Sequence, residues 1–247
     1  MSWLETATQG RVRKLTLNRA EKRNALSAGL CTELVEAIET ADRNPEVRAI
    51  LLVGNGPVFC AGMDLSEIGA VMEEEIHEAH ERLFTAGARI ATPLLAAVEG
   101  PALGGGTGLV ANCHIVVASE GATFGLTEIR LGLWPFLVYR PLEDAVGECR
   151  ALELALTGRV FSAQEAVELG LVHEISPHPE ARATGLAQAI ADASPLAVQN
   201  GMAFVREIKG TDWQAAARTA RRVRGKVFES AEFREGIRAF LEKRAPK

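Results

Sequence analysis

Two glycine-containing loops are the segments of this sequence whose residue types could do chemistry. The first runs from Gly54 to Ile68 and reads GNGPVFCAGMDLSEI, and the second, Pro101–Leu109, reads PALGGGTGL. Each loop follows an apolar run typical of a strand and precedes a segment typical of a helix. Glycine permits positive φ angles and close approach of another group, and the first N–H groups of a helix point outward without partners. Side by side, two such loops would direct two N–H donors at one oxygen atom, which is an oxyanion hole.

Two other interpretations of these glycines are weaker. The glycines could only permit tight strand–helix turns, but two loops with the same order of elements favour a shared site. The segment from Gly106 to Ala111 also fits G-x-G-x-x-A, a pattern of dinucleotide-binding proteins. The helix needed for the phosphates would have to end by about Cys113, where the next strand-like run begins, and the motif lies in mid-chain. We therefore do not expect a dinucleotide site.

The elements that must position these loops form an α/β pattern. Short β-rich runs alternate with helical ones from about Arg11 to about Ile175, and the middle runs are continuously apolar, as in a parallel sheet covered on both faces. Ser27 is expected to cap one helix and Ser162 another, which Gly170 would end. The expected strands are Arg11–Asn18, Val47–Gly54, Pro93–Gly100, His114–Ser119 and Leu171–Ser176.

The last part of the sequence has a different pattern. After Pro179 it is almost entirely helical, and Ser194 followed by Pro195 is typical of a helix start. We therefore divide the chain into a core of residues 1–178 and a helical region of residues 179–247. A helical tail of this size often packs on another subunit, and we expect that here.

The composition is that of a soluble protein with an ordinary core. Apolar residues make up 47% of the chain, the net charge is −5 and the pI is about 5.7, so the chain has no overall attraction to nucleic acid or anionic membranes. No signal peptide pattern and no apolar run of membrane-spanning length is visible, so we expect an intracellular, cytoplasmic protein. The cysteines lack CxxC spacing and are expected to be reduced thiols, at positions 31, 60, 113 and 149.

Several long segments together resemble the crotonase superfamily, which includes the enoyl-CoA hydratases and isomerases. They are LTLNRAEKRNALS, VRAILLVGNGPVFCAGMDLSE, AAVEGPALGGGTGLVANCHIVVASEGATFGLTEIRLGL, ALELALTGRVFSAQEAVELGLVHEI and the C-terminal FLEKRAPK. The resemblance implies the crotonase fold, an α/β spiral of ββα units with a helical C-terminal trimerisation region. It also implies trimers or dimers of trimers and acyl-CoA thioester substrates. Coenzyme A is then part of the substrate, and no metal or separate cofactor is expected.

The resemblance assigns the two N–H donors and the coenzyme A contacts. The motif AGMDL places one oxyanion-hole N–H at Met63, and the middle glycine of LGGG places the other at Gly105, with Gly104 beside it allowing close approach. Both N–H groups would bond the thioester oxygen as it gains enolate charge. The coenzyme A contacts map around Arg23, Ala25, Leu26, Ala61, Gly62, Asp64 and Leu65.

The resemblance also identifies one catalytic carboxylate. Hydratases of this family use two glutamates, one placed three positions after the middle glycine and one in a PEI-like segment. In this chain those positions are Gly108 and Glu128, so one carboxylate is replaced by a hydrogen. A single carboxylate can remove a proton from C2 of a 3-enoyl thioester and return it to C4. The segment LWPFLVYRPLEDAVG also resembles monofunctional 3,2-enoyl-CoA isomerases, so the sequence predicts a double-bond shift with Glu128 as the base.

Two alternatives remain open. Hydration of 2-enoyl-CoA would need a second polar group, for which Tyr139, Glu143, Asp144 and Glu120 are candidates. A non-catalytic relative that binds CoA esters or RNA is the further alternative, because residues 217–226 read ARTARRVRGK. That basic run has no interleaved aromatic residues and the chain is acidic, so a solvated helix face or a site for CoA phosphates is favoured and nucleic acid is not an expected partner.

The histidines are expected to be structural. His77 and His80 lie three residues apart in a Glu-rich amphipathic stretch, which indicates a solvated helix face rather than a metal site. His114 follows Cys113 at the start of a strand and lacks the serine or acid partner of a catalytic triad.

Overall fold

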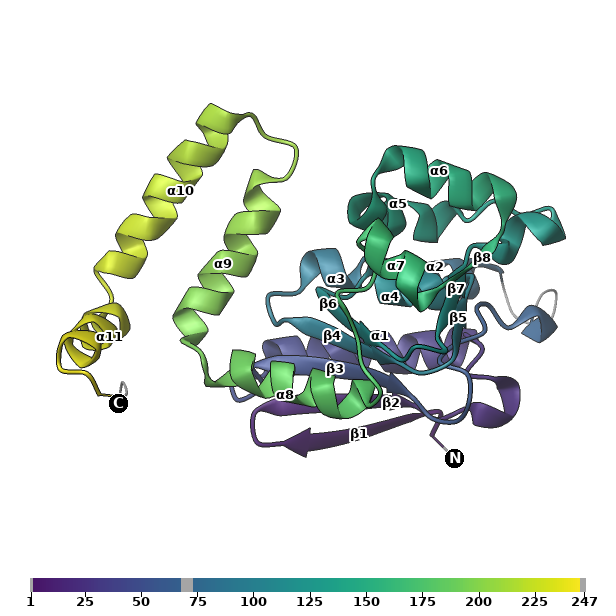
Figure 1. Ribbon diagram of the computed structural model, residues 1–247, viewed down its shortest axis with the longest axis horizontal. Coiled ribbons are helices and arrows are strands. Elements are labelled where there is room, and N and C mark those ends of the chain that lie inside the picture. Colours follow the sequence, from purple (N-terminus) through teal and green to yellow (C-terminus); the bar gives the residue numbers. More distant parts are fainter. Residues whose placement is uncertain (1, 68–72, 245–247) are drawn as a thin grey trace. The chain divides into compact units, whose positions relative to one another are not determined.

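The chain divides into two compact units, Met1–Ala189 and Ile190–Lys247. The structure is a computed structural model that describes residues 2–67 and 73–244 (Figure 1). The sequence predicted a boundary after residue 178, which is where helix α8 (Pro179–Asp192) begins, whereas the two units divide inside that helix. The first unit contains both sheets.

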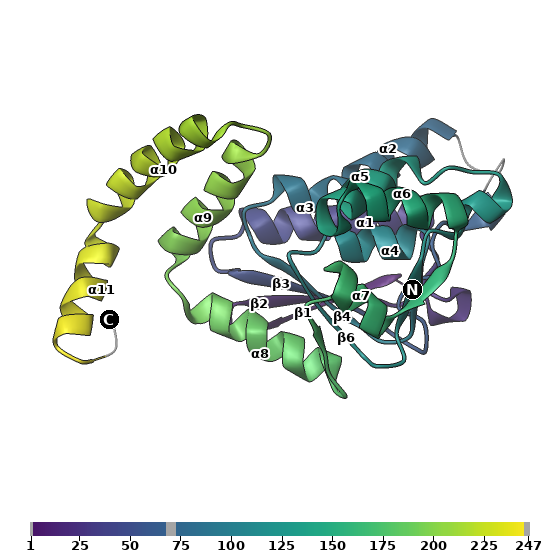
Figure 2. The ribbon, with the colours of Figure 1, turned by 45° about the horizontal axis from the view of Figure 1, so that its top comes forward.

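The larger sheet has six strands in the order β1-β2-β3-β4-β6-β9. Strands β1 and β2 pair antiparallel, and all other neighbours pair parallel. Every residue of β4 is buried, because helix α1 (Ala28–Arg43) covers one face of the sheet and the first part of α8 covers the other (Figures 1 and 2). The strands are β1 (Leu4–Gln9), β2 (Val12–Leu17), β3 (Ala49–Gly54), β4 (Leu94–Val98), β6 (Ile115–Ala118) and β9 (Glu174–Ile175).

A second sheet of three short strands carries the glycine-rich loop. Its strands are β5 (Pro101–Leu103), β7 (Thr123–Gly125) and β8 (Val160–Ser162), with β5 parallel to β7 and β7 antiparallel to β8. The chain leaves β4, turns at Gly100 with φ of 67° and enters β5 directly. The segment PALGGGTGL therefore begins as a strand of the second sheet and continues as helix α4 (Gly105–Ala111).

The five expected strands all appear as β2, β3, β4, β6 and β9, although β9 has only two residues. Strands β1, β5, β7 and β8 were not predicted. The sequence of β1, LETATQ, has no apolar alternation, and only Leu4 of this strand is buried. The three strands of the second sheet are too short to show a period.

The expected helix caps are present. The Ser27 hydroxyl accepts a hydrogen bond from Leu30 N at 3.1 Å, and the Ser162 hydroxyl accepts one from Glu165 N at 3.2 Å. Helix α7 ends at Gly170, whose φ is 89°. The further helices of the first unit are α2 (Glu73–Phe84), α3 (Ala86–Arg89), α4, α5 (Phe136–Val146), α6 (Glu148–Thr157), α7 (Ala163–Leu169) and the 3-10 helices η1 (Ala20–Lys22), η2 (Leu65–Glu67) and η3 (Thr127–Leu131).

The second unit consists of the end of α8 and three further helices, α9 (Pro195–Ile208), α10 (Trp213–Phe228) and α11 (Ala231–Leu241). The Ser194 hydroxyl accepts from Ala197 N at 3.1 Å, as expected for the cap of α9. The basic run lies on α10, where Arg222 forms an ion pair with Glu207 of α9. No helix in the described ranges is long and apolar enough to span a membrane.

The cysteines are mostly packed as small apolar side chains. Cys31, Cys60 and Cys113 are buried, whereas Cys149 is exposed. Burial raises the pKa of the Cys60 and Cys113 thiols to about 12, so both stay protonated at neutral pH.

Candidate active site

The two glycine loops lie side by side, as the sequence predicted. Cys60 of the first loop pairs with Ala102 of β5 in a parallel bridge. Leu103 N donates to Cys60 O at 2.9 Å, and Cys60 N donates to Pro101 O at 3.3 Å. The loops are so close that a Cβ atom on Gly62 would lie 3.3 Å from Gly105 N. Backbone groups of both loops are therefore directed into one space.

The N–H groups of Met63 and Gly105 are free to bind a ligand oxygen. Gly105 begins α4 after Gly104, whose φ of 53° turns the chain from the strand into the helix, and Met63 follows Gly62 with φ of 92°. In the part of the chain that the structure describes, neither N–H has a hydrogen-bond acceptor. Both residues line the same pocket. Two unpaired backbone N–H groups beside one pocket are the donors that an oxyanion hole requires.

Leu26 holds the Met63 segment in place through the backbone. Leu26 N donates to Gly62 O at 2.8 Å, and Asp64 N donates to Leu26 O at 2.9 Å. The chain before Leu26 is bent by Arg23 and Asn24, which have φ of 54° and 51° although neither is glycine. Such angles persist only where the surroundings fix them, and the fully buried Asn24 side chain does so by donating to two backbone carbonyls, those of Asn55 and Val58.

Asp64 acts as an anchor of the same segment. Its Oδ2 atom lies 2.6 Å from Arg19 Nη1 in a buried ion pair, and its Oδ1 atom accepts from the Ser66 hydroxyl at 2.6 Å. The bond from Ser66 and then the Arg19 guanidinium lower the pKa of Asp64 to about 2. The Arg19 guanidinium also stacks over the Trp3 ring, 5.4 Å from its centroid. The carboxylate is therefore held by protein groups on both oxygens.

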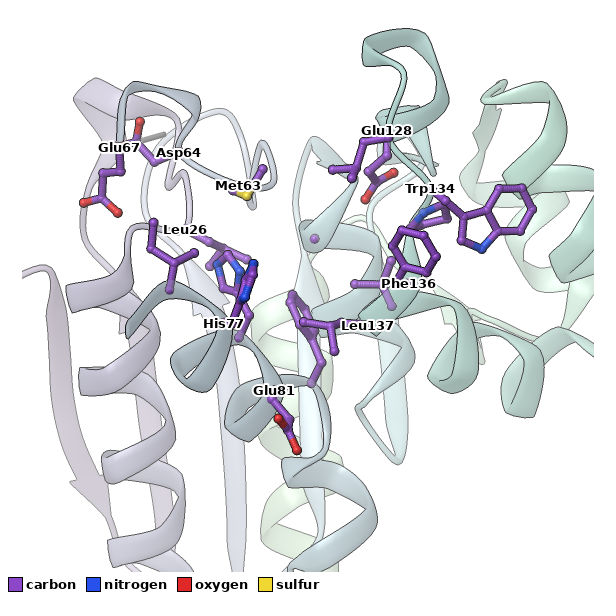
Figure 3. A pocket seen from close by; sticks show the side chains of 17 residues that line it. Leu26, Met63, Asp64, Glu67, His77, Glu81, Glu128, Trp134, Phe136 and Leu137 are labelled. Atoms are coloured by element: carbon purple, nitrogen blue, oxygen red, sulfur yellow. The ribbon is translucent and has the colours of Figure 1, made fainter. Parts of the chain in front are cut away.

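The pocket between the loops has a volume of about 530 Å³ and mostly apolar walls. One wall is formed by Leu26 and Met63, and the opposite wall by Glu128 and Phe136 (Figure 3). Helix α2 and the start of α5 with the segment before it complete the lining. The residues are Ile76, His77, His80, Glu81 and Phe84 from α2, residues 133–135 from the segment and residues 136–138 from the first turn of α5. Such a lining suits an apolar chain with a few polar groups directed at it.

Glu128 is one of four acidic residues in the pocket lining, with Asp64, Glu67 and Glu81. It lies on η3, and its carboxyl group points into the pocket opposite Met63 (Figure 3). Burial raises its pKa, although its own backbone N–H acts in the opposite direction. Its Oε2 atom is buried without a hydrogen-bond partner, and Oε1 would lie 3.1 Å from a Cβ atom on Gly104. Glycine at 104 therefore leaves the room that this carboxyl group occupies.

Gly108, the position to which the family resemblance assigns the other glutamate of a hydratase, is closely packed. A Cβ atom there would lie 2.3 Å from Val138 Cγ1, 2.7 Å from Val138 Cβ and 3.0 Å from Phe84 Cε1. Real Cβ atoms do not approach other atoms so closely. A larger side chain at 108 therefore requires α4 and α5 to move apart.

A profile of the enoyl-CoA hydratase/isomerase family matches residues 7–247. This chain belongs to that family. It is 37% identical to an enoyl-CoA hydratase of Mycobacterium tuberculosis over 242 residues, covering 94% of this chain and 91% of the relative. It is 36% identical to the 2,3-dehydroadipyl-CoA hydratase of Escherichia coli over 250 residues, covering 100% and 98%. A crystal structure of an enoyl-CoA hydratase from Mycobacterium smegmatis matches with a TM-score of 0.94 and 32% identity, covering 100% and 99% of the two chains.

Membership of the family establishes the crotonase fold and an enzyme of the crotonase type. Of the residues predicted for the site, Leu26, Met63, Asp64, Gly105 and Glu128 line the pocket. The other predicted residues do not line it, namely Arg23, Ala25, Ala61, Gly62, Leu65 and Gly104. Gly62 and Gly104 nevertheless shape it, since both adjoin the N–H donors.

The four candidates for a second polar group lie outside the lining. Glu143 and Asp144 form ion pairs with Arg140 at 2.6 and 3.0 Å, and Glu120 is exposed. The Tyr139 ring packs against the Trp134 ring, with centroids 5.9 Å apart. Within the described ranges none of these four side chains contributes to the pocket.

His80 corrects the sequence prediction of a solvated helix face. The side chain is buried and lines the pocket, whereas His77 is exposed. The signal in the sequence was the spacing of Ile76, His80 and Phe84, which places His80 on the apolar face of α2. His114 has the structural role expected of it, because its Nδ1 accepts from Leu94 N at 2.9 Å.

Proposed function

We propose that this protein is an acyl-CoA enzyme that adds water across the double bond of 2-enoyl-CoA thioesters. The single observation that supports the chemistry is the buried Glu128 carboxyl group, which faces the free N–H groups of Met63 and Gly105 across one apolar pocket. The choice of hydration is supported by relatives with hydratase names that match almost the whole chain at 36% and 37% identity.

The two backbone N–H groups would stabilise the enolate. When water attacks C3, electrons move onto the thioester oxygen, and Met63 N–H and Gly105 N–H would bond that oxygen more strongly as its charge grows. One such donor is worth about a hundred- to a thousand-fold in rate. Because both donors belong to the backbone, the methionine side chain is not required for this step.

Glu128 would transfer the proton. The water oxygen forms a bond to C3, the water proton goes to the Glu128 carboxylate, and the carboxyl group then returns a proton to C2. A raised pKa brings the carboxyl group closer to the pH at which it can both accept and donate. The sum is the addition of one H and one OH to the double bond.

The second candidate is the double-bond shift that the sequence predicted. The packing of Val138 and Phe84 against Gly108 favours it, because the shift from 3-enoyl to 2-enoyl requires only one carboxylate. The names of the relatives support hydration better than this shift. The pocket with its buried carboxyl group favours either reaction over a non-catalytic or RNA-binding role.

One experiment tests the proposal. Wild type and Glu128→Gln are offered 2-enoyl-CoA and 3-enoyl-CoA, and the release of 3-hydroxyacyl-CoA and of 2-enoyl-CoA is followed. We expect hydration by wild type and a loss of about a hundred-fold or more in Glu128→Gln. Glu143→Gln is the matched control, since Glu143 lies outside the pocket. Wild type that only shifts the double bond would select the second candidate, and a fully active Glu128→Gln would refute the role of Glu128.

For the second unit, the subunit interface expected from the family resemblance stays a proposal. Its helices expose large apolar side chains, including Trp213 at 92%, Phe240 at 79% and Leu241 at 74%. Apolar side chains exposed in such number are typical of a surface that another chain covers.

A further inference from the structure

Two unpartnered polar atoms lie in the pocket walls. Among the described residues, four buried side-chain polar atoms lack a hydrogen-bond partner, namely Arg13 Nε, Arg48 Nη1, His80 Nε2 and Glu128 Oε2. The last two belong to residues that line the same pocket. An unpaired buried polar atom is costly and rare in native proteins, so such atoms mark places where a ligand supplies the partner. The proposed function uses Glu128 and leaves His80 unexplained.

His80 lies near the oxyanion hole. Its ring centroid is 5.9 Å from that of Phe84, one helical turn later in α2. Phe84 Cζ would lie 3.2 Å from a Cβ atom on Gly105, and Leu26 Cδ1 would lie 3.0 Å from the same atom. The Phe84 ring therefore lies beside both the imidazole and Gly105, and His80 and Gly105 line the same pocket.

The imidazole is suited to an oxygen that both donates and accepts. Burial lowers the pKa of His80, the neighbouring His77 lowers it further, and the backbone of Leu26 acts in the opposite direction. A neutral imidazole carries one N–H and one free lone pair. Water or a hydroxyl group can pair with the unpartnered Nε2 atom in either tautomer, whereas a hydrocarbon chain leaves that atom unpaired.

We propose that His80 binds the oxygen that is added to C3 of the acyl chain, and so replaces the second glutamate that Gly108 lacks. This inference rests on the proposed hydration. His80 hydrogen-bonds the attacking water and then the C3 hydroxyl group of the product, and it keeps its own proton throughout. Glu128 takes the water proton and passes a proton to C2, so the atoms balance without a further reactant.

The test measures binding without turnover. Every variant carries Glu128→Gln, and the affinities for 3-hydroxybutyryl-CoA and butyryl-CoA are measured by calorimetry. His80→Leu should reduce the preference for the hydroxy compound by about tenfold, the effect of one hydrogen bond, and His80→Gln, which keeps an N–H, should restore part of it. His178→Leu, which removes an exposed histidine that lies outside the pocket lining, should leave the preference unchanged.

An unchanged preference in His80→Leu would overturn the inference, and so would an equal loss in His178→Leu. If His80→Leu does not fold, His80→Phe fills the space beside Phe84 without a polar nitrogen and gives the same comparison. The outcome is separate from that of the proposed function. A wild type that does not hydrate 2-enoyl-CoA but shows the His80 effect would refute the reaction and keep this contact.

Discussion

Gly108→Ala is expected to destabilise the protein, although glycine-to-alanine changes inside a helix ordinarily stabilise. Alanine is favoured over glycine in a helix interior by about 1 kcal/mol. Here the added Cβ atom would lie 2.3 Å from Val138 Cγ1 and 2.7 Å from Val138 Cβ. Rotation of the valine side chain does not move its Cβ atom, so α4 and α5 must separate. Overpacking costs about 1–3 kcal/mol, and two contacts below 3.0 Å place this site in the upper part of that range. After subtraction of the helix gain of about 1 kcal/mol, we expect a net loss of about 1–2 kcal/mol.

Urea denaturation of four proteins checks this prediction, namely wild type, Gly108→Ala, Val138→Ala and the double variant. Val138→Ala alone should cost about 2 kcal/mol through the cavity it leaves. In the double variant the Cγ1 contact is gone and only the Cβ contact at 2.7 Å remains, so its loss should be smaller than the sum of the single losses by about 0.5 kcal/mol or more. A Gly108→Ala protein as stable as wild type, or strictly additive losses, would refute the contact between Gly108 and Val138.

The remaining predictions concern the segment that holds the N–H donors. Gly62→Ala should lower the turnover of enoyl-CoA by about a hundred-fold, because φ is 92° at this position and the new Cβ atom would lie 2.9 Å from Leu103 O. The control is Gly121→Ala, where a Cβ atom meets nothing within 4 Å, and it should stay active in the same assay. The folded pKa of Asp64, about 2, lies below its ordinary value of 3.8, so its charged form stabilises the fold above about pH 4 and this contribution is lost as the pH falls towards 2. The stability difference between wild type and Asp64→Asn should therefore shrink by about 2 kcal/mol over that range in denaturation curves, and a constant difference would contradict the role of the Arg19 pair.

Much of the fold was predictable because the central strands are buried on both faces. Short continuous apolar runs such as AILLV and LLAAV are typical of interior strands. Ser27, Ser162 and Gly170 mark helix ends through their local hydrogen bonding. Strand β1 was missed because it pairs at the edge with five exposed residues. The second sheet was missed because three-residue strands are stabilised by their neighbours rather than by their own pattern.

In the candidate site, the sequence predicted the backbone arrangement better than the side-chain arrangement. The meeting of the two loops could be predicted from the sequence because their close approach demands glycine at positions such as 62 and 104, whereas the assignment of the N–H donors came from the family resemblance. The groups that decide the reaction have no such signature. Whether a carboxylate side chain fits at position 108 depends on Val138, which belongs to another helix. Whether His80 faces solvent or the pocket depends on which side of α2 is buried. In this chain the Phe84 ring bears on both positions, since its Cε1 atom would lie 3.0 Å from a Cβ atom at 108 and its centroid lies 5.9 Å from that of His80. A change at Phe84 would therefore alter the space at 108 and the setting of the imidazole together.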